Sequence, residues 1–325
     1  MNERKFPALG ERLYEDTLPN GLKISVVPKM GFARSYAFFA ANYGSMDTRF
    51  RLDGKSYVSP DGVAHYLEHK MFDLPDGNAL QMMSCTGASP NAFTAYHITA
   101  YHFSCTDSFQ ENFELLLRFV SEGYFTQESV EKERGIIAQE IKMYEDNPGS
   151  RVDENLYRAM YHHHPIRVPI AGTVESIQDI TAQILTDCHR AFYDPSNMVL
   201  CVVGDVDPEN IRDTALRILP KEPGGASARD YGEPEPETPM QHTITQEMEV
   251  AMPMFSVGFK GKPIPKGAQR LRQEIIGDLA GEVLCGESSR LYQKLYEDGL
   301  IDSGFAVGYA TIRELAMLCL GGDSE

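Results

Sequence analysis

The stretch His65-Tyr66-Leu67-Glu68-His69 lies on a predicted helix that extends from about Asp61 to Phe72. The two histidines are four residues apart, so both imidazoles leave one face of that helix, one turn apart. Glu68 follows His65 by three residues and shares this face. Two neutral imidazoles and a nearby carboxylate are the nitrogen and oxygen ligands that a hydrolytic zinc ion prefers. The stretch therefore predicts a zinc site, in the inverted order H-x-x-E-H of the zinc metalloprotease motif.

A catalytic zinc ion usually has three protein ligands, so another ligand is expected from elsewhere in the chain. A second predicted helix, from Thr126 to about Glu145, carries Glu133 and Glu140 seven residues apart, two turns along one face. The same helix has three aliphatic residues that would pack it into the core: Ile136, Ile137 and Ile141. A carboxylate face on a partly buried helix is unusual, and a metal ion would explain it. The alternative is an ordinary solvated face, which the charged run at 131–134 fits.

The overall composition excludes several classes of protein. The 325 residues include 30 Lys and Arg against 47 Asp and Glu, a net charge of −17. This balance argues against nucleic-acid binding, which needs clustered positive charge, and against docking on an anionic membrane surface. The hydrophobic fraction of 42% is ordinary for a globular protein. A chain of this length usually forms about two domains.

The N-terminal residues 1–16 are polar and contain no recognisable secretory signal. No apolar run approaches the roughly 18 residues that a membrane span needs. The six cysteines are scattered and form no C-x-x-C pair, which predicts reduced thiols rather than a disulfide framework or a zinc-thiolate site. These features together predict a cytoplasmic protein with no membrane partner.

The predicted helices and strands fall into two groups, with a segment of different composition between them. Strands are expected at 23–28, 35–43, 91–105 and 199–204, and a helix at 109–121. Residues 221–239 are rich in Pro, Gly and Glu, and we interpret them as a linker between a first domain, 1–220, and a second domain, 240–325. The alternative is a long surface loop within one domain.

The predicted second domain loosely repeats the beginning of the first. A strand at 255–260 is followed by helices at 269–284 and 288–296 and by strands at 304–309 and 315–321. A full repeat of the first domain would need about twice the residues that follow the linker. We therefore expect this second domain to be incomplete, with a naturally short domain as the alternative.

Two other groups of histidines have simpler interpretations. The run His162-His163-His164 could bind a metal, but Pro165 after it favours the end of a helix at the surface. His97 and His102 are five residues apart on the predicted strand 91–105, so they would point to opposite faces and pack in the core or at its rim.

The motifs together resemble the pitrilysin/insulinase family of inverted zinc peptidases, which includes the mitochondrial processing peptidase. That family combines H-x-x-E-H with a glutamate some seventy residues downstream, within an E-x6-E pattern. Here Glu140 lies 71 residues after His69, and Glu133 completes the pattern. In detail the chain is most similar to the bacterial branch, in which a chain of two homologous domains pairs with a second chain. Other matching segments are 18–22 (LPNGL), 91–94 (NAFT), 171–176 (AGTVES) and 193–198 (YDPSNM).

The resemblance implies an α+β fold of two homologous domains, each a mainly antiparallel sheet with helices on one face. It implies that His65, His69 and Glu140 bind Zn2+. Glu68 would act as general base on the attacking water and then deliver the proton to the leaving amine. Glu133 would orient a ligand histidine or the helix that carries Glu140.

The resemblance also implies a zinc-dependent endopeptidase that hydrolyses short or unfolded peptides. Asn91, Ala92 and Phe93 should lie on an edge strand, to which a substrate peptide adds through backbone hydrogen bonds. In the family an Arg and a Tyr from the second half-molecule complete the site. The second domain has Tyr309 and Arg313, but no motif aligns them with that pair, so we expect a homologous partner subunit, in a homodimer or heterodimer, to supply it. The alternative is a non-catalytic assembly or peptide-binding subunit of a related complex.

Overall fold

A computed structural model of the protein describes residues 1–222, 224, 228–262 and 267–324. The chain divides into two compact units, a first unit of residues 1–138 and 170–231 and a second unit of residues 139–169 and 232–325. The boundary at Ala138 falls inside one continuous helix, α4 (Gln127–Glu145). The expected division into 1–220, a linker and 240–325 stays a prediction. Parts of the expected linker and second domain lie outside the described residues: 223, 225–227, 263–266 and 325.

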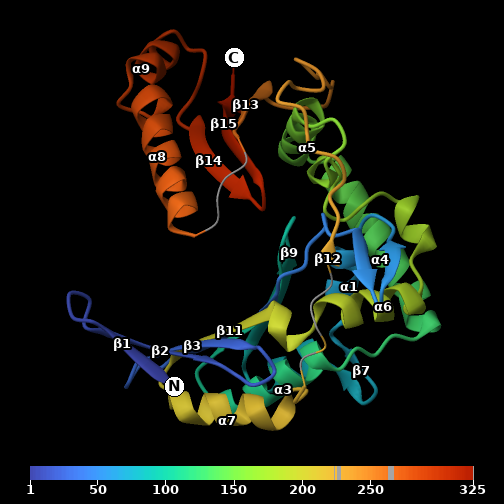
Figure 1. Ribbon diagram of the computed structural model, residues 1–325. Helices are drawn as coiled ribbons and strands as arrows, with labels where there is room; N and C mark the ends of the chain where they lie inside the picture. The colour runs from blue at the N-terminus through green and yellow to red at the C-terminus, as the bar shows by residue number, and fades with distance from the viewer. Residues whose placement is uncertain (223, 225–227, 263–266, 325) are drawn as a thin grey trace. The chain divides into compact units, whose positions relative to one another are not determined.

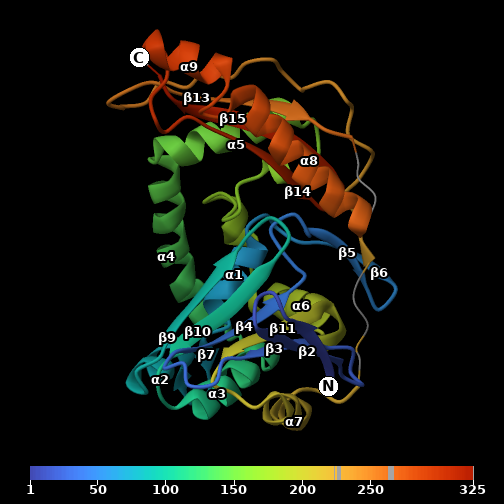
Figure 2. The ribbon, with the colours of Figure 1, turned by 90° about the vertical axis from the view of Figure 1, so that its left-hand side faces the viewer.

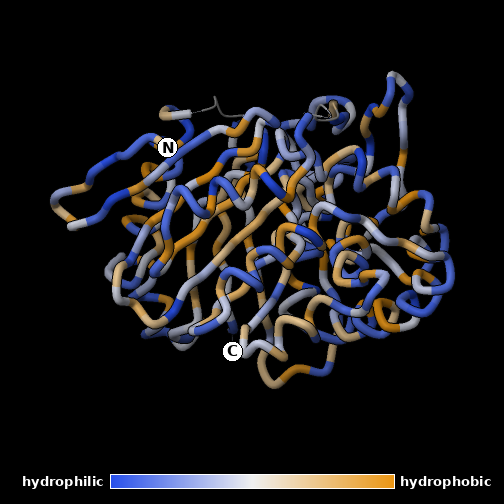
Figure 3. The backbone as a smooth tube through the Cα atoms, turned by 90° about the horizontal axis from the view of Figure 1, so that it is seen from below, coloured by the Kyte–Doolittle hydropathy of each residue, from blue (hydrophilic) through white to orange (hydrophobic). Residues whose placement is uncertain are grey.

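The first unit is built on a mainly antiparallel sheet, as expected. Among the described residues this sheet has seven strands in the order β1-β2-β3-β11-β4-β10-β9. All neighbours are antiparallel except β3 and β11, which are parallel. The strands are β1 (Asn2–Phe6), β2 (Glu11–Thr17), β3 (Lys23–Pro28), β4 (Ser35–Ala41), β9 (Ser89–Thr94), β10 (Thr99–Cys105) and β11 (Met198–Gly204). The hairpin of β1 and β2 forms one edge and is mainly hydrophilic (Figure 3).

One face of this sheet is covered by helices. Its alternating inward residues, such as Ile24, Phe39 and Leu200, are almost completely buried, as the period of two in a half-covered strand requires. Tyr101 on β10 packs against Phe119 with ring centroids 5.7 Å apart. Figure 1 shows two of the covering helices, α3 and α7, together on one side of the sheet. The helices of this unit, apart from α4, are α1 (Val63–Lys70), α2 (Ala79–Cys85), α3 (Phe109–Ser121), α6 (Ala182–Phe192) and α7 (Pro208–Ile218).

Two small sheets complete the first unit. The first has the order β12-β5-β6, and β12 comes from the segment interpreted as a linker. A two-stranded ribbon of β7 and β8 follows α1. The strands are β5 (Arg49–Leu52), β6 (Lys55–Val58), β7 (Asp73–Leu74), β8 (Gly77–Asn78) and β12 (Ala228–Arg229).

The second unit repeats the combination of antiparallel strands and helices on a smaller scale. Its sheet has the order β13-β15-β14, and α8 lies along β14 (Figure 2). A core of Cys285, Tyr292, Ile301 and Phe305 joins α8 and α9 to this sheet. The elements are α5 (Pro148–Met160), α8 (Ala268–Cys285), α9 (Arg290–Glu297), β13 (Met254–Lys260), β14 (Ala306–Ile312) and β15 (Leu315–Asp323). The mixed α+β fold class predicted from the sequence is therefore confirmed.

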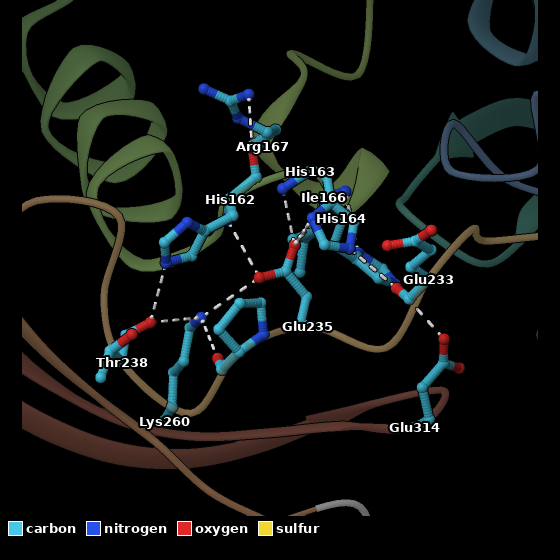
Figure 4. A network of polar contacts seen from close by, with 11 residues as sticks. His162, His163, His164, Ile166, Arg167, Glu233, Glu235, Thr238, Lys260 and Glu314 are labelled. Carbon is cyan, nitrogen blue, oxygen red and sulfur yellow. Dashed lines mark hydrogen bonds and ion pairs between the residues drawn. The ribbon is translucent and has the colours of Figure 1, made fainter.

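Backbone hydrogen bonds to Glu235 join the two segments of the second unit, 139–169 and the chain after Tyr231. The amides of His162, His163 and His164 donate to the carboxylate of Glu235 at 3.0, 2.7 and 2.5 Å, and the Lys260 ammonium lies 3.3 Å from the same carboxylate (Figure 4). Burial raises the pKa of Glu235, but these four donors outweigh it and hold the pKa at about 2. The carboxylate is therefore ionised across the physiological range.

Four local predictions were wrong. Ile136, which was expected to pack its helix into the core, is 51% exposed, although Ile137 and Ile141 are buried as expected. The segment 91–105 is a hairpin of β9 and β10 rather than one strand, so His97 lies in its turn. The run of histidines does follow the end of a helix, but His164 is only 3% exposed and caps a short 3-10 turn instead of lying at the surface. The helix predicted to begin at about Asp61 begins at Val63, with Gly62 rather than Asp61 as its N-cap.

None of the helices in the described part of the chain combines the length and the apolar character that crossing a bilayer needs.

Candidate metal centre

Helix α1 places the residues of the H-x-x-E-H motif on the covered side of the first unit. His65 and Glu68 are each 8% exposed, and the imidazole rings of His65 and His69 lie with their centroids 4.7 Å apart. The N-cap of this helix is Gly62, which has a left-handed φ of 88°. A side chain there would bring its Cβ within 2.4 Å of the carbonyl oxygen of Ala171, so glycine is required at this close approach.

One group of possible metal ligands is present among the described residues. It consists of His65, His69 and Glu140, whose ligand atoms all lie within 4.8 Å of one another. Ligands at about 2.0–2.2 Å around a tetrahedral zinc ion are roughly 3.4 Å apart, a spacing close to that of this group. Two imidazoles and one carboxylate are also the donor set of known catalytic zinc sites. The residues present therefore fit a zinc ion.

Glu133 lies behind one of these histidines. Its Oε1 atom is 3.0 Å from Nδ1 of His69, and the two side chains are 20% and 25% exposed. The hydrogen bond to His69 lowers the pKa of Glu133, against the opposing effect of burial. A carboxylate on Nδ1 favours the tautomer whose Nε2 carries the lone pair, and this is the usual support of a metal-binding histidine.

Two further hydrogen bonds involve α4, one from α1 and one within α4 itself. The Tyr66 hydroxyl of α1 donates to the carbonyl of Val130 on α4. Burial raises the pKa of Tyr66 to about 12, so the hydroxyl keeps its proton at neutral pH. On α4 itself, the hydroxyl of Tyr144 donates to Oε1 of Glu140 at 3.0 Å. These contacts limit the positions that the motif residues can take.

Glu68 has a partner that sequence reasoning missed. The hydroxyl of Thr94 on β9 donates to its Oε2 atom at 2.5 Å. In the sequence, Thr94 stands out only as the last residue of the segment 91–94 (NAFT). Its position on a strand does not predict which side chain of a helix it contacts. Lys70, next to His69, is 2% exposed and pairs with Asp73 in the ribbon after α1.

The residues expected to bind substrate lie on β9, at the other edge of the seven-stranded sheet. Phe93 is 42% exposed, and its ring faces Phe38 with centroids 6.2 Å apart. Within the second unit, Tyr309 lies on β14 and accepts a hydrogen bond from Gln273 at 3.1 Å, and Arg313 lies in the turn after β14. A role of either in the metal centre stays a prediction.

Comparisons with known proteins place the chain in a family. Residues 55–174 match the model of the insulinase family, peptidase family M16, and residues 179–325 match the model described as the peptidase M16 inactive domain. The chain belongs to this family of peptidases.

Individual proteins that are similar to this chain have names of the same kind. The chain is 42% identical to the uncharacterized zinc protease YmfH of Bacillus subtilis, over 98% of this chain and 76% of that protein. Its fold is similar to the crystal structure of a putative M16-like peptidase from Alicyclobacillus acidocaldarius, with a TM-score of 0.91 and 37% identity, over 99% of this chain and 76% of that one. A protease from Helicobacter pylori shares the fold, with a TM-score of 0.77 and 20% identity, over 97% of this chain and 75% of that one.

Proposed function

We propose that this protein is a zinc-dependent endopeptidase that cleaves short or unfolded peptides. The observation that carries the proposal is the approach of His65, His69 and Glu140 to within 4.8 Å, with Glu133 hydrogen-bonded to His69 from behind. Three ligands supported in this way leave a coordination position open, which separates catalytic from structural zinc sites. The names of the relatives as zinc proteases support the same metal.

The proposed roles follow from the contacts of each side chain. His65, His69 and Glu140 hold the zinc ion, which when bound polarises the scissile carbonyl and makes water a better nucleophile. Glu68, on the same helix face as the histidines, takes the proton of the attacking water and delivers it to the leaving amine. Glu133 keeps the imidazole of His69 in its binding orientation.

The substrate is proposed to bind as an added strand. β9 is an edge strand, and the unpaired backbone groups of such a strand can pair with an extended peptide. Asn91, Ala92 and Phe93 would form that contact, and the exposed ring of Phe93 would pack against a substrate side chain. Because strand addition requires an extended backbone, folded proteins would be poor substrates.

A second homologous subunit is proposed to supply an Arg and a Tyr to the reaction. Activity should then follow the oligomer, so the native mass and the turnover of each fraction from size-exclusion chromatography test this part of the proposal. A monomer with the full specific activity would contradict it. The alternative of a non-catalytic assembly or peptide-binding subunit draws support from the description of the family's C-terminal model as inactive.

The central experiment compares the parent with Glu68→Gln on an unstructured fluorogenic peptide. We expect chelation to abolish cleavage, zinc to restore it, and Glu68→Gln to keep zinc while losing about 100-fold or more in rate. Glu131→Gln, an exposed glutamate of α4, is the matched control and should leave the rate unchanged. A parent that binds zinc and peptide without any turnover would instead support the non-catalytic alternative.

A further inference from the structure

The general base has a contact outside the metal group, on the strand proposed to receive the substrate. Thr94 is the last residue of β9, and its hydroxyl oxygen is 2.5 Å from Oε2 of Glu68. This distance lies in the range of about 2.5–2.7 Å that is typical of a hydroxyl bound to an ionised carboxylate. Such a bond is roughly twice as strong as one between neutral groups.

The neighbouring residues determine the direction of this hydrogen bond. Thr99 faces Thr94 across the hairpin, with their hydroxyl oxygens 3.5 Å apart, and is completely buried. Its hydroxyl donates to the carbonyl of Tyr43 at 2.9 Å. Each threonine has a single hydroxyl proton, and an ionised carboxylate can only accept. Since the proton of Thr99 is directed to Tyr43, the proton of Thr94 is available for Glu68.

A hydrogen bond at this position restricts the motion that matters for a general base. The terminal torsion of a glutamate is broad, so a carboxylate with nothing to orient it rotates readily. A proton-transfer group must lie within about 2.6–3.2 Å of its target in a defined direction. The Thr94 hydroxyl limits the rotation of the Glu68 carboxylate about this torsion.

We propose that Thr94 is a positioning residue that orients the Glu68 carboxylate. This inference rests on the proposed function, because it takes Glu68 as the general base. Thr94 lies on the same strand as Asn91, Ala92 and Phe93, so it also connects the proposed peptide-binding edge to the base. A peptide that adds to β9 would then bind to the strand that orients Glu68.

The experiment compares one variant of Thr94 that removes the hydroxyl with one that retains it. Thr94→Val keeps the shape of the side chain, and Thr94→Ser keeps the hydroxyl. Thr186→Val on α6 is the control, since it removes a hydroxyl that donates to a helix carbonyl at 2.8 Å, away from Glu68. We expect Thr94→Val to lower kcat about 10-fold, with KM within about twofold, and Thr94→Ser to recover most of the loss.

Two readouts do not depend on turnover. Zinc content should be unchanged in all three variants, and crystal structures should show the Glu68 carboxylate rotated in Thr94→Val but not in Thr94→Ser. The inference is overturned by a Thr94→Val enzyme with the kcat of the Thr186→Val control, or by a Thr94→Ser enzyme no faster than Thr94→Val. Should circular dichroism show that Thr94→Val is misfolded, Thr94→Ser and Thr94→Ala replace it, and equal rates for these two overturn the inference.

Glu68→Gln, measured in the same series, separates this inference from the proposed function. If Glu68→Gln is as active as the parent, the assignment of the general base fails. If Glu68→Gln is inactive while the Thr94 variants match the parent, only the role of Thr94 fails.

Discussion

Replacing Glu133 with Gln removes the negative charge of the carboxylate that is hydrogen-bonded to His69 and keeps the size of the side chain. The hydrogen bond between Glu133 Oε1 and His69 Nδ1 is 3.0 Å long, and at most a quarter of either side chain is exposed. A hydrogen bond to a charged group contributes about 1.5–3 kcal/mol, and about 1.4 kcal/mol corresponds to a tenfold change in an equilibrium constant. Glutamine can still offer a neutral acceptor of roughly half the strength. We therefore expect zinc to bind about 10-fold more weakly to Glu133→Gln and about 100-fold more weakly to Glu133→Ala.

The assay is zinc dissociation by competition with a chromogenic chelator at neutral pH. Glu131→Gln is the matched control, because it removes the same charge from an exposed position two residues earlier on α4. Its zinc affinity should equal that of the parent. If both Glu133 variants bind zinc within twofold of this control, the hydrogen bond to His69 does not support metal binding, and the proposed role of Glu133 is wrong.

Three further predictions concern the ligand set, the substrate edge and stability. Glu140→Ala should lose stoichiometric zinc by metal analysis, whereas Glu145→Ala at the end of the same helix should retain it. Phe93→Ala should raise KM severalfold with little change in kcat, and an unchanged KM would argue against strand addition at β9. Glu235→Gln should lower the thermal unfolding midpoint above about pH 4.5, because the folded-state pKa of Glu235, about 2, lies below the ordinary 4.5. The difference in unfolding midpoint from the parent should shrink as the pH falls from 4.5 towards 2. A difference that stays constant would argue against a contribution of the Glu235 charge to stability.

Regular elements were predicted well where the local pattern is strong. The helix at 109–121 and the strand at 23–28 have the predicted bounds, since each has one apolar face with a clear period. The segment 91–105 was less predictable, because Thr, Tyr and Phe favour strands on both sides of a turn. The short turn at 95–98 contains neither Gly nor Pro to mark it.

Local sequence is enough to predict that His65, Glu68 and His69 share one helix face, because the period of the α-helix places residues three and four apart together. It also predicts that Glu133 and Glu140 share a face of a second helix. The contact of Glu133 with His69, and the approach of Glu140 to the two histidines, follow instead from the three-dimensional packing of two helices, which depends on contacts far apart in the chain. The contact of Thr94 with Glu68 likewise depends on the packing of β9 against α1, which no spacing along the chain encodes.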